Sequence, residues 1–183
     1  ACPRLDEWVS ALQGSRVVGR PGDYAPLILD PAGRLYLYRY WAYERTVADF
    51  VRSHAALPLE AVHRATLAAG IARYFAGEPT DWQRAAALVA LHRRFLVISG
   101  GPGTGKTSTV VKVLALLLEQ PGNERLRVAV AAPTGKAAAR LKDSLGDAGA
   151  HLPAPPEILD RIPTDVSTIH RLLGAIRGSS QFR

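Results

Sequence analysis

The sequence predicts an α/β fold, in which an incomplete parallel sheet carries helices and is preceded by a small, mostly helical domain with a β-hairpin. Residues 95–99 and 126–132 are short, largely apolar stretches, as expected of strands that are buried on both faces. Each is followed by a glycine-containing turn and then by a helical pattern, at 106–120 and 135–145. Strands that alternate with helices in this way are typical of a parallel sheet.

The region before this sheet has a different pattern. Two apolar stretches, 26–30 and 34–40, flank an Asp-Pro-Ala-Gly turn and predict a β-hairpin. Tyr36, Tyr38 and Tyr40 would share one face of its second strand, and a half-buried sheet face is favoured over a surface that stacks bases. Helices are expected at 43–56, 60–75 and 82–92, with a domain boundary near 77–80 that divides the chain into 1–78 and 79–183.

Composition limits the class of protein. The 183-residue chain has 48% hydrophobic and 21% charged residues, which argues against disorder and against a coiled-coil rod. No apolar run approaches the roughly 20 residues of a membrane-spanning helix, and no basic-then-apolar leader opens the chain, so we expect a cytoplasmic protein with no membrane partner. The single Cys2 excludes an internal disulfide and a cysteine-based zinc site. Because methionine is absent and the chain begins at Ala1, we interpret it as a piece of a longer protein.

The charge is unevenly distributed. The net charge is +7, with 9 basic and 8 acidic residues in 1–80 and 14 basic and 8 acidic residues in 81–183. A basic second half favours a polyanionic partner, of which nucleic acid is the first candidate. A merely solvated basic face is the alternative at this point.

One glycine-rich segment carries the strongest functional signal. Residues 100–107 read Gly-Gly-Pro-Gly-Thr-Gly-Lys-Thr and match the pattern G-x-x-x-x-G-K-[ST] between a predicted strand and a predicted helix. The glycines let backbone N–H groups turn toward phosphate oxygens, and the helix N-terminus adds partial positive charge. As candidate catalytic residues, Lys106 is expected at the β- and γ-phosphates of a nucleotide and Thr107 at Mg²⁺. The other nucleotide contacts expected in this loop are Gly101, Pro102, Gly103, Thr104, Gly105 and Ser108.

A second turn of this kind follows the second predicted strand. Pro133 and Thr134 come after that strand, and Gly135 and Lys136 open a helix, so backbone N–H groups are again available to a phosphate. Both turns should lie at the carboxyl edge of the sheet. A nucleotide beside a nucleic-acid backbone would fit two such sites.

Weaker candidates lie before and after these turns. The amide of Gln83 offers the donor and acceptor that an adenine edge demands, although the residue taken alone favours a surface glutamine. The neighbouring Trp82 is expected in the core. Residues 146–165 have the composition of a surface loop. In the short helix expected at 167–173, Thr168 and His170 could bind phosphate or sugar, or simply belong to a capped helix.

Four segments resemble a known family: WQRAA, LVISGGPGTGKTSTVVKVLALL, VAVAAPTGKAAARLKDSLG and STIHRLLG. They are similar to the RecD family, the α subunit of exodeoxyribonuclease V (RecBCD), over residues 80–174, and the hairpin region resembles the N-terminal part of that family. The resemblance implies a superfamily-1 DNA helicase with a RecA-like P-loop NTPase sheet that uses ATP and Mg²⁺. It places Gln83 at the adenine, and Thr134, Lys136 and His170 near single-stranded DNA. It also implies a 5′-to-3′ motor that assembles with RecB and RecC in bacterial double-strand-break repair.

An element needed for ATP hydrolysis is not evident. An acidic pair at the end of a third apolar strand would hold Mg²⁺ and polarise the attacking water. Glu119 follows three leucines, but it belongs to the P-loop helix and should point away from the nucleotide, and Asp160 lies in the proline-rich loop. We therefore expect a chain that binds nucleotide without hydrolysing it alone. Two alternatives stay open: a small-molecule P-loop phosphotransferase, and a non-catalytic module for DNA binding or subunit docking.

Overall fold

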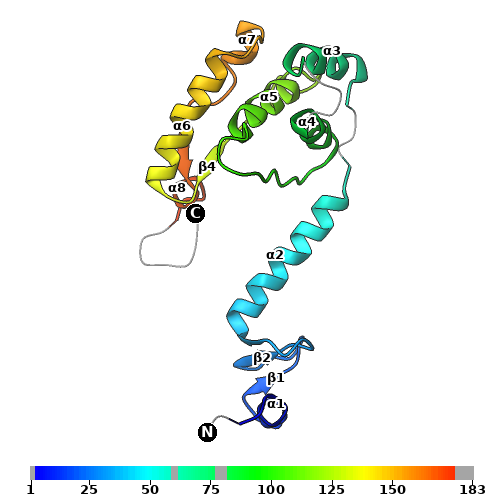
Figure 1. Cartoon of the computed structure of the whole chain (residues 1–183), viewed down its shortest axis with the longest axis vertical. Coiled ribbons are helices and arrows are strands. Elements are labelled where there is room, and N and C mark those ends of the chain that lie inside the picture. Colours follow the sequence, from blue (N-terminus) through cyan, green and yellow to red (C-terminus); the bar gives the residue numbers. More distant parts are fainter. Residues whose placement is uncertain (1–2, 59–61, 77–81, 176–183) are drawn as a thin grey trace. The chain divides into compact units, whose positions relative to one another are not determined.

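The computed structural model describes residues 3–58, 62–76 and 82–175. The chain forms two compact units, Ala1–Ala56 and Leu57–Arg183, and Figure 1 allows each to be followed along the sequence. This division differs from the boundary expected near 77–80, because helix α3 (Arg64–Tyr74) packs against α5 (Lys106–Leu118) of the second unit. Residues 77–81, where the boundary was expected, lie outside the described residues.

The first unit contains the predicted hairpin. Helix α1 (Leu5–Gln13) precedes a three-stranded sheet in the order β1-β2-β3, formed by Val18–Gly19, Leu27–Leu29 and Leu35–Leu37. Strand β2 pairs antiparallel with β3 and parallel with β1. The hairpin turn is closed by the carboxylate of Asp30, which accepts hydrogen bonds of 2.9 Å from the backbone N–H groups of Ala32 and Arg34.

The predicted tyrosine stripe is wrong in its second half. Strand β3 ends at Leu37, opposite Leu27, and the backbone N–H of Tyr38 bonds to the carbonyl of Pro26. Helix α2 (Tyr38–Ala56) begins at that point rather than at residue 43. Of the three tyrosines only Tyr36 lies on a strand. The pairing of β3 with β2 ends at Leu37, so Tyr38 and Tyr40 belong to helix α2.

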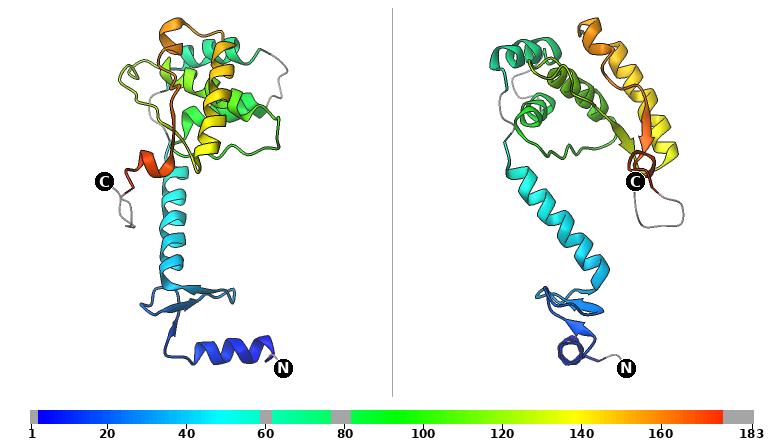
Figure 2. Two further views of the ribbon diagram at one scale, coloured as in Figure 1. Left: turned by 90° about the vertical axis from the view of Figure 1, so that its left-hand side faces the viewer. Right: turned by 180° about the vertical axis from the view of Figure 1, so that it is seen from behind.

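The second unit is mostly helical. Its P-loop helix α5 packs against α3, α4, α6 and the short α7, and Figure 1 shows α4 and α6 on either side of it. Strands β4 and β5 pair in parallel from Val130 opposite Val166 to Ala132 opposite Thr168, with α6 between them in the sequence and beside them in space (Figure 2). The remaining bounds are α4 Trp82–His92, β4 Val130–Ala132, α6 Gly135–Ala150, α7 Pro156–Leu159, β5 Val166–Thr168 and α8 Ile169–Leu172.

The structure differs from the two strands that the apolar runs predict. Residues 95–99 form no strand, and Val97 is 71% exposed. Of the stretch 126–132 only the last three residues are in a strand. The reason is pairing: a strand needs a ladder partner, and within the described residues β4 has one only where β5 runs alongside it.

The expected surface loop at 146–165 is also corrected. Helix α6 continues to Ala150, and Leu152, Ile158 and Ile162 are buried in the core of the second unit. The guanidinium of Arg161 donates to the backbone carbonyl oxygens of Leu118, at 3.1 Å, and of Asn123, and so attaches this segment to the end of α5. The helix expected at 167–173 begins only at Ile169, because residues 166–168 pair with β4.

The core of the second unit is built around α5. Val111, Ala115 and Leu116 of this helix have no exposed surface. The close approach of α3 depends on Gly70, where a Cβ atom would lie 2.4 Å from Cδ2 of Leu116. The helix that carries the glycine-rich loop is therefore fixed from several sides.

Candidate nucleotide and nucleic-acid sites

The glycine-rich loop leads directly into the N-terminus of α5. Gly105 is the N-cap of this helix and has a left-handed backbone, with φ of 75° and ψ of 20°. The backbone N–H of Thr109 bonds to the carbonyl of Gly105 at 2.9 Å and closes the first turn. The N–H groups of the residues before Thr109 have no carbonyl partner inside the helix. This geometry suits an anion, since those N–H groups and the helix dipole act in the same direction.

Lys106 is folded back over its own loop. Its Nζ donates to the carbonyl oxygens of Gly100 at 2.7 Å and of Gly101 at 2.5 Å. The hydroxyl of Thr104 also donates to the Gly101 carbonyl, at 2.9 Å. A phosphate would offer the ammonium charged oxygens in place of neutral carbonyls, and charge-assisted hydrogen bonds are the stronger ones.

Gln83 is tied to the loop from helix α4. Its Nε2 donates to the backbone carbonyl of Thr104 at 3.1 Å, so the amide contacts the loop that was expected to hold phosphate. The adenine contact expected for Gln83 stays a prediction. Both residues line a pocket of about 430 Å³ together with Trp82, Ala86, Val97, Ile98, Ser99, Gly100, Lys106 and Thr109.

Trp82 contradicts the expectation that it lies in the core. Its side chain is 82% exposed at the start of α4 and lines the same pocket. Val97 and Ile98 could not be predicted as lining residues of a pocket, because an apolar run of this length is typical of a buried strand. An aromatic ring and two aliphatic side chains beside the glycine-rich loop form a surface on which a nucleotide base can pack.

Replacing Gly105 with alanine should weaken nucleotide binding by tenfold or more. A left-handed backbone costs a residue with a Cβ atom roughly 1–2 kcal/mol, and that atom would lie 2.5 Å from Nε2 of Gln83. Fluorescence titration with a labelled ATP analogue measures the effect. Gly146→Ala is the control, because its Cβ would meet nothing within 4 Å and its φ is not positive. Equal affinity of Gly105→Ala and the parent chain would contradict this account of the loop.

The residues at the start of α5 fit Mg²⁺ as a partner of a bound nucleotide. Thr107 is half-buried in the first turn of the helix, where its hydroxyl can supply one oxygen ligand. Within the described ranges no group of three His, Cys, Asp or Glu residues is placed to hold a metal ion. Mg²⁺ is commonly held by one or two protein oxygens together with substrate phosphates and water, which is the donor set that Thr107 and a nucleotide provide.

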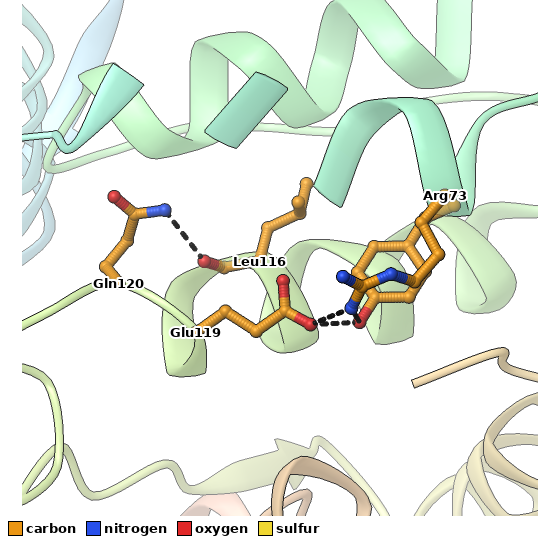
Figure 3. A network of polar contacts seen from close by, with 5 residues as sticks. Arg73, Leu116, Glu119 and Gln120 are labelled. Carbon is orange, nitrogen blue, oxygen red and sulfur yellow. Dashed lines mark hydrogen bonds and ion pairs between the residues drawn. The ribbon is translucent and has the colours of Figure 1, made fainter. Parts of the chain in front are cut away.

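Glu119 lies at the other end of α5 from Lys106, as expected. Its carboxylate accepts a 2.8 Å hydrogen bond from Nη1 of Arg73 and a short one from the hydroxyl of Tyr74, so it joins α5 to α3 (Figure 3). Gln120 continues this junction, since its amide accepts from the backbone N–H of His63 and donates to the carbonyl of Leu116. These polar groups stabilise the helix packing and are not part of the nucleotide site.

The Tyr74 hydroxyl should give the second unit a pH dependence above pH 10. Burial and the Glu119 carboxylate raise the pKa of Tyr74 to about 12. In the unfolded chain this hydroxyl loses its proton near pH 10, so the contribution to stability is complete below pH 10 and is lost as the pH rises toward 12. Tyrosinate absorbance should show one of the six tyrosines titrating last, and Tyr74→Phe should remove it. A titration in which all tyrosines ionise together near pH 10 would contradict the network.

The second turn has the expected geometry. Thr134 is the N-cap of α6, and its hydroxyl oxygen accepts from the backbone N–H of Ala137 at 3.2 Å. Thr168 caps α8 in the same way, through the N–H of Arg171 at 3.2 Å. Because Ala132 is the register partner of Thr168, both caps leave the β4–β5 pair at its carboxyl edge. The residues expected at DNA are mostly exposed there, namely Pro133, Thr134, Gly135, Lys136 and His170, with Thr168 half-buried.

A protein-family model described as an AAA domain matches residues 83–183. The chain belongs to this AAA-domain family. The match begins at Gln83 and takes in both the glycine-rich loop and the second turn. Among the helices of the described residues, none is both long and apolar enough to cross a membrane.

Curated relatives of this AAA-domain chain carry RecD or RecD2 names. It is 40% identical to the RecBCD enzyme subunit RecD of Mycolicibacterium smegmatis over 99% of its length, and 33% identical to the subunit of that name from Haemophilus influenzae over 93%. It spans 31% and 28% of those two proteins. The ATP-dependent RecD2 DNA helicase of Deinococcus radiodurans is 43% identical over 44% of this chain and 8% of that protein. The resemblance to RecD is therefore confirmed.

Proposed function

We propose that this chain is the nucleotide-binding part of an ATP-dependent DNA helicase subunit of the RecBCD type. Its parent protein would move 5′-to-3′ along single-stranded DNA, in complex with RecB and RecC, during double-strand-break repair. The observation that carries the proposal is the loop of Gly100 to Lys106 at the N-terminus of α5, in a chain that matches RecD proteins over nearly its whole length.

The residues of the first site have distinct roles in this proposal. ATP with Mg²⁺ supplies the phosphoanhydride whose hydrolysis drives movement. The N–H groups at the start of α5 bind phosphate oxygens, and Lys106 leaves the carbonyls of Gly100 and Gly101 to neutralise the β- and γ-phosphates. Thr107 supplies the hydroxyl ligand to Mg²⁺. Gln83 holds the loop through its hydrogen bond to the Thr104 carbonyl, and its amide would also hydrogen-bond to the edge of the adenine in the pocket that Trp82 lines.

The second site binds the DNA backbone. Thr134 and Lys136 begin α6, and Thr168 and His170 begin α8, at one carboxyl edge. Exposed N–H groups and a lysine at that edge suit phosphates. Such a site has no role in a small-molecule phosphotransferase, which makes that alternative the weaker one. A DNA-binding or docking module without ATP chemistry would not account for the lysine in the glycine-rich loop, Lys106.

The test is Mg²⁺-ATP turnover by the chain, with and without single-stranded DNA, together with nucleotide and DNA binding. We expect nucleotide binding and DNA binding without turnover, because hydrolysis needs an acidic pair at Mg²⁺, and in the described ranges no group of three His, Cys, Asp or Glu residues is placed to hold a metal ion. The control variant Lys136→Ala should lower the salt dependence of DNA binding by about 0.7 to 1 in slope and keep nucleotide affinity. A chain that binds ATP but no DNA would overturn the helicase assignment, and DNA-stimulated turnover would overturn the claim of inactivity.

A further inference from the structure

A groove on α6 continues from the second turn. It has a volume of about 400 Å³ and is lined by Thr134, Lys136, Ala137, Arg140, Leu141 and Ser144. Lys136 and Arg140 are four residues apart, so their side chains lie one above the other on the helix. Both are exposed, and neither forms an ion pair with any residue in the part of the chain that the structure describes.

The lining of this groove combines two kinds of surface. Lys136, Arg140 and the Ser144 hydroxyl offer hydrogen-bond donors, and the guanidinium can bind a phosphate through two parallel N–H bonds. Ala137 and Leu141 offer apolar surface next to these donors. Phosphates that alternate with sugars in a nucleic-acid strand present the complementary pattern, namely anionic groups beside surfaces with apolar C–H edges.

Neighbouring charges limit how far along α6 an anion can bind. Asp143 and Asp147 occupy the following turns, are exposed, and do not line the groove. Their carboxylates would repel a phosphate beyond Arg140. Lys142 also lies outside the groove, and its Nζ is 3.1 Å from the Asp165 carboxylate, so its charge is already paired. The favourable contact is therefore confined to the first two turns of the helix.

We propose that Arg140 binds a backbone phosphate of single-stranded DNA, adjacent to the phosphate at Lys136. The DNA site would then extend from the caps at Thr134 and Thr168 along the first two turns of α6. This inference rests on the proposed function, because it takes the polyanion at the second turn to be DNA. It adds Arg140 to the DNA contacts that the sequence predicts.

The experiment compares three variants of the chain by their affinity for oligothymidylate at several salt concentrations. Arg140→Ala should lower the slope of log K against log salt by about 0.7, the value for one phosphate contact on a single strand. Arg140→Lys should restore most of that slope, since it keeps the charge. Lys142→Ala is the matched control on the same helix and should leave the slope unchanged. An unchanged unfolding midpoint in all three confirms that the fold is intact.

The outcomes separate this inference from the proposed function. If Lys136→Ala lowers the slope and Arg140→Ala does not, DNA binds at the second turn but the extension along α6 is wrong. Equal effects of Arg140→Ala and Lys142→Ala would mean that only net charge matters, which also overturns it. If the unmodified chain binds no DNA, both the proposed function and this inference are wrong. Competition by polyglutamate as strong as that by DNA would assign the groove to an acidic polypeptide and overturn the inference.

Discussion

Lys106→Ala should weaken Mg²⁺-ATP binding by about a hundredfold or more. Each hydrogen bond to a charged group contributes about 1.5–3 kcal/mol, and the ammonium can give two to the phosphates, while a tenfold change in affinity corresponds to 1.4 kcal/mol. In the structure Lys106 donates to two carbonyl oxygens of its own loop, at 2.7 and 2.5 Å, and to the Thr104 hydroxyl at 3.5 Å, so the fold should tolerate its loss. Isothermal titration calorimetry with a non-hydrolysable analogue measures the change.

The control for this prediction lies on the same helix. Lys112 places its Nζ 4.6 Å from the centroid of the Phe75 ring and does not line the pocket beside the glycine-rich loop. Lys112→Ala removes the same charge from α5 and should keep nucleotide affinity within about twofold. If both variants lose affinity to the same extent, the effect comes from net charge or from α5 stability, and the phosphate role of Lys106 is wrong.

Leu116→Ala should reduce the free energy of unfolding of the second unit by about 2–5 kcal/mol, the range for large-to-small changes in a core. Leu116 has no exposed surface and lies directly against Gly70, where no side chain is available to fill the space left behind. Urea denaturation followed by circular dichroism measures the loss. The glycine-rich loop precedes α5, the helix that contains Leu116. We therefore also expect the nucleotide affinity of this variant to fall as the temperature approaches its unfolding transition.

Leu172→Ala provides the comparison for Leu116. This leucine is in α8 of the same unit and is 48% exposed, so removing its side chain should change stability by about 0.5 kcal/mol or less. Comparable losses from the two variants would show that the packing of α3 against α5 does not determine the stability of this unit.

The loop proposed to bind nucleotide could be predicted from the sequence because it is local. Eight consecutive residues define the glycine-rich loop, and a left-handed Gly105 followed by a helix is encoded within that segment. The bounds of α4, the antiparallel hairpin of β2 and β3, and the cap at Thr134 are equally local, since they depend on turn and capping residues. The place of Arg140 beside Lys136 follows from helical spacing alone once α6 is known.

Pairing and packing between distant segments could not be obtained in this way. An apolar run such as 95–99 looks the same whether or not a ladder partner is present, and 166–168 became a strand only because β4 lies beside it. The segment 146–165 has the composition of a loop, yet Arg161 reaches 43 residues back to the carbonyl of Leu118 and Ile158 enters the core.

The sequence by itself therefore determined the local features on which the proposed chemistry rests: the glycine-rich loop, its lysine and threonine, and the basic second turn. The tertiary structure decided which strands exist, where the compact units divide, and that Gln83 contacts the loop through Thr104. The physical reason is the distance along the chain over which each interaction acts. Turns, caps and glycine backbones are fixed by neighbours in the chain, whereas a ladder, a buried face or a long-range hydrogen bond depends on residues that only folding brings together.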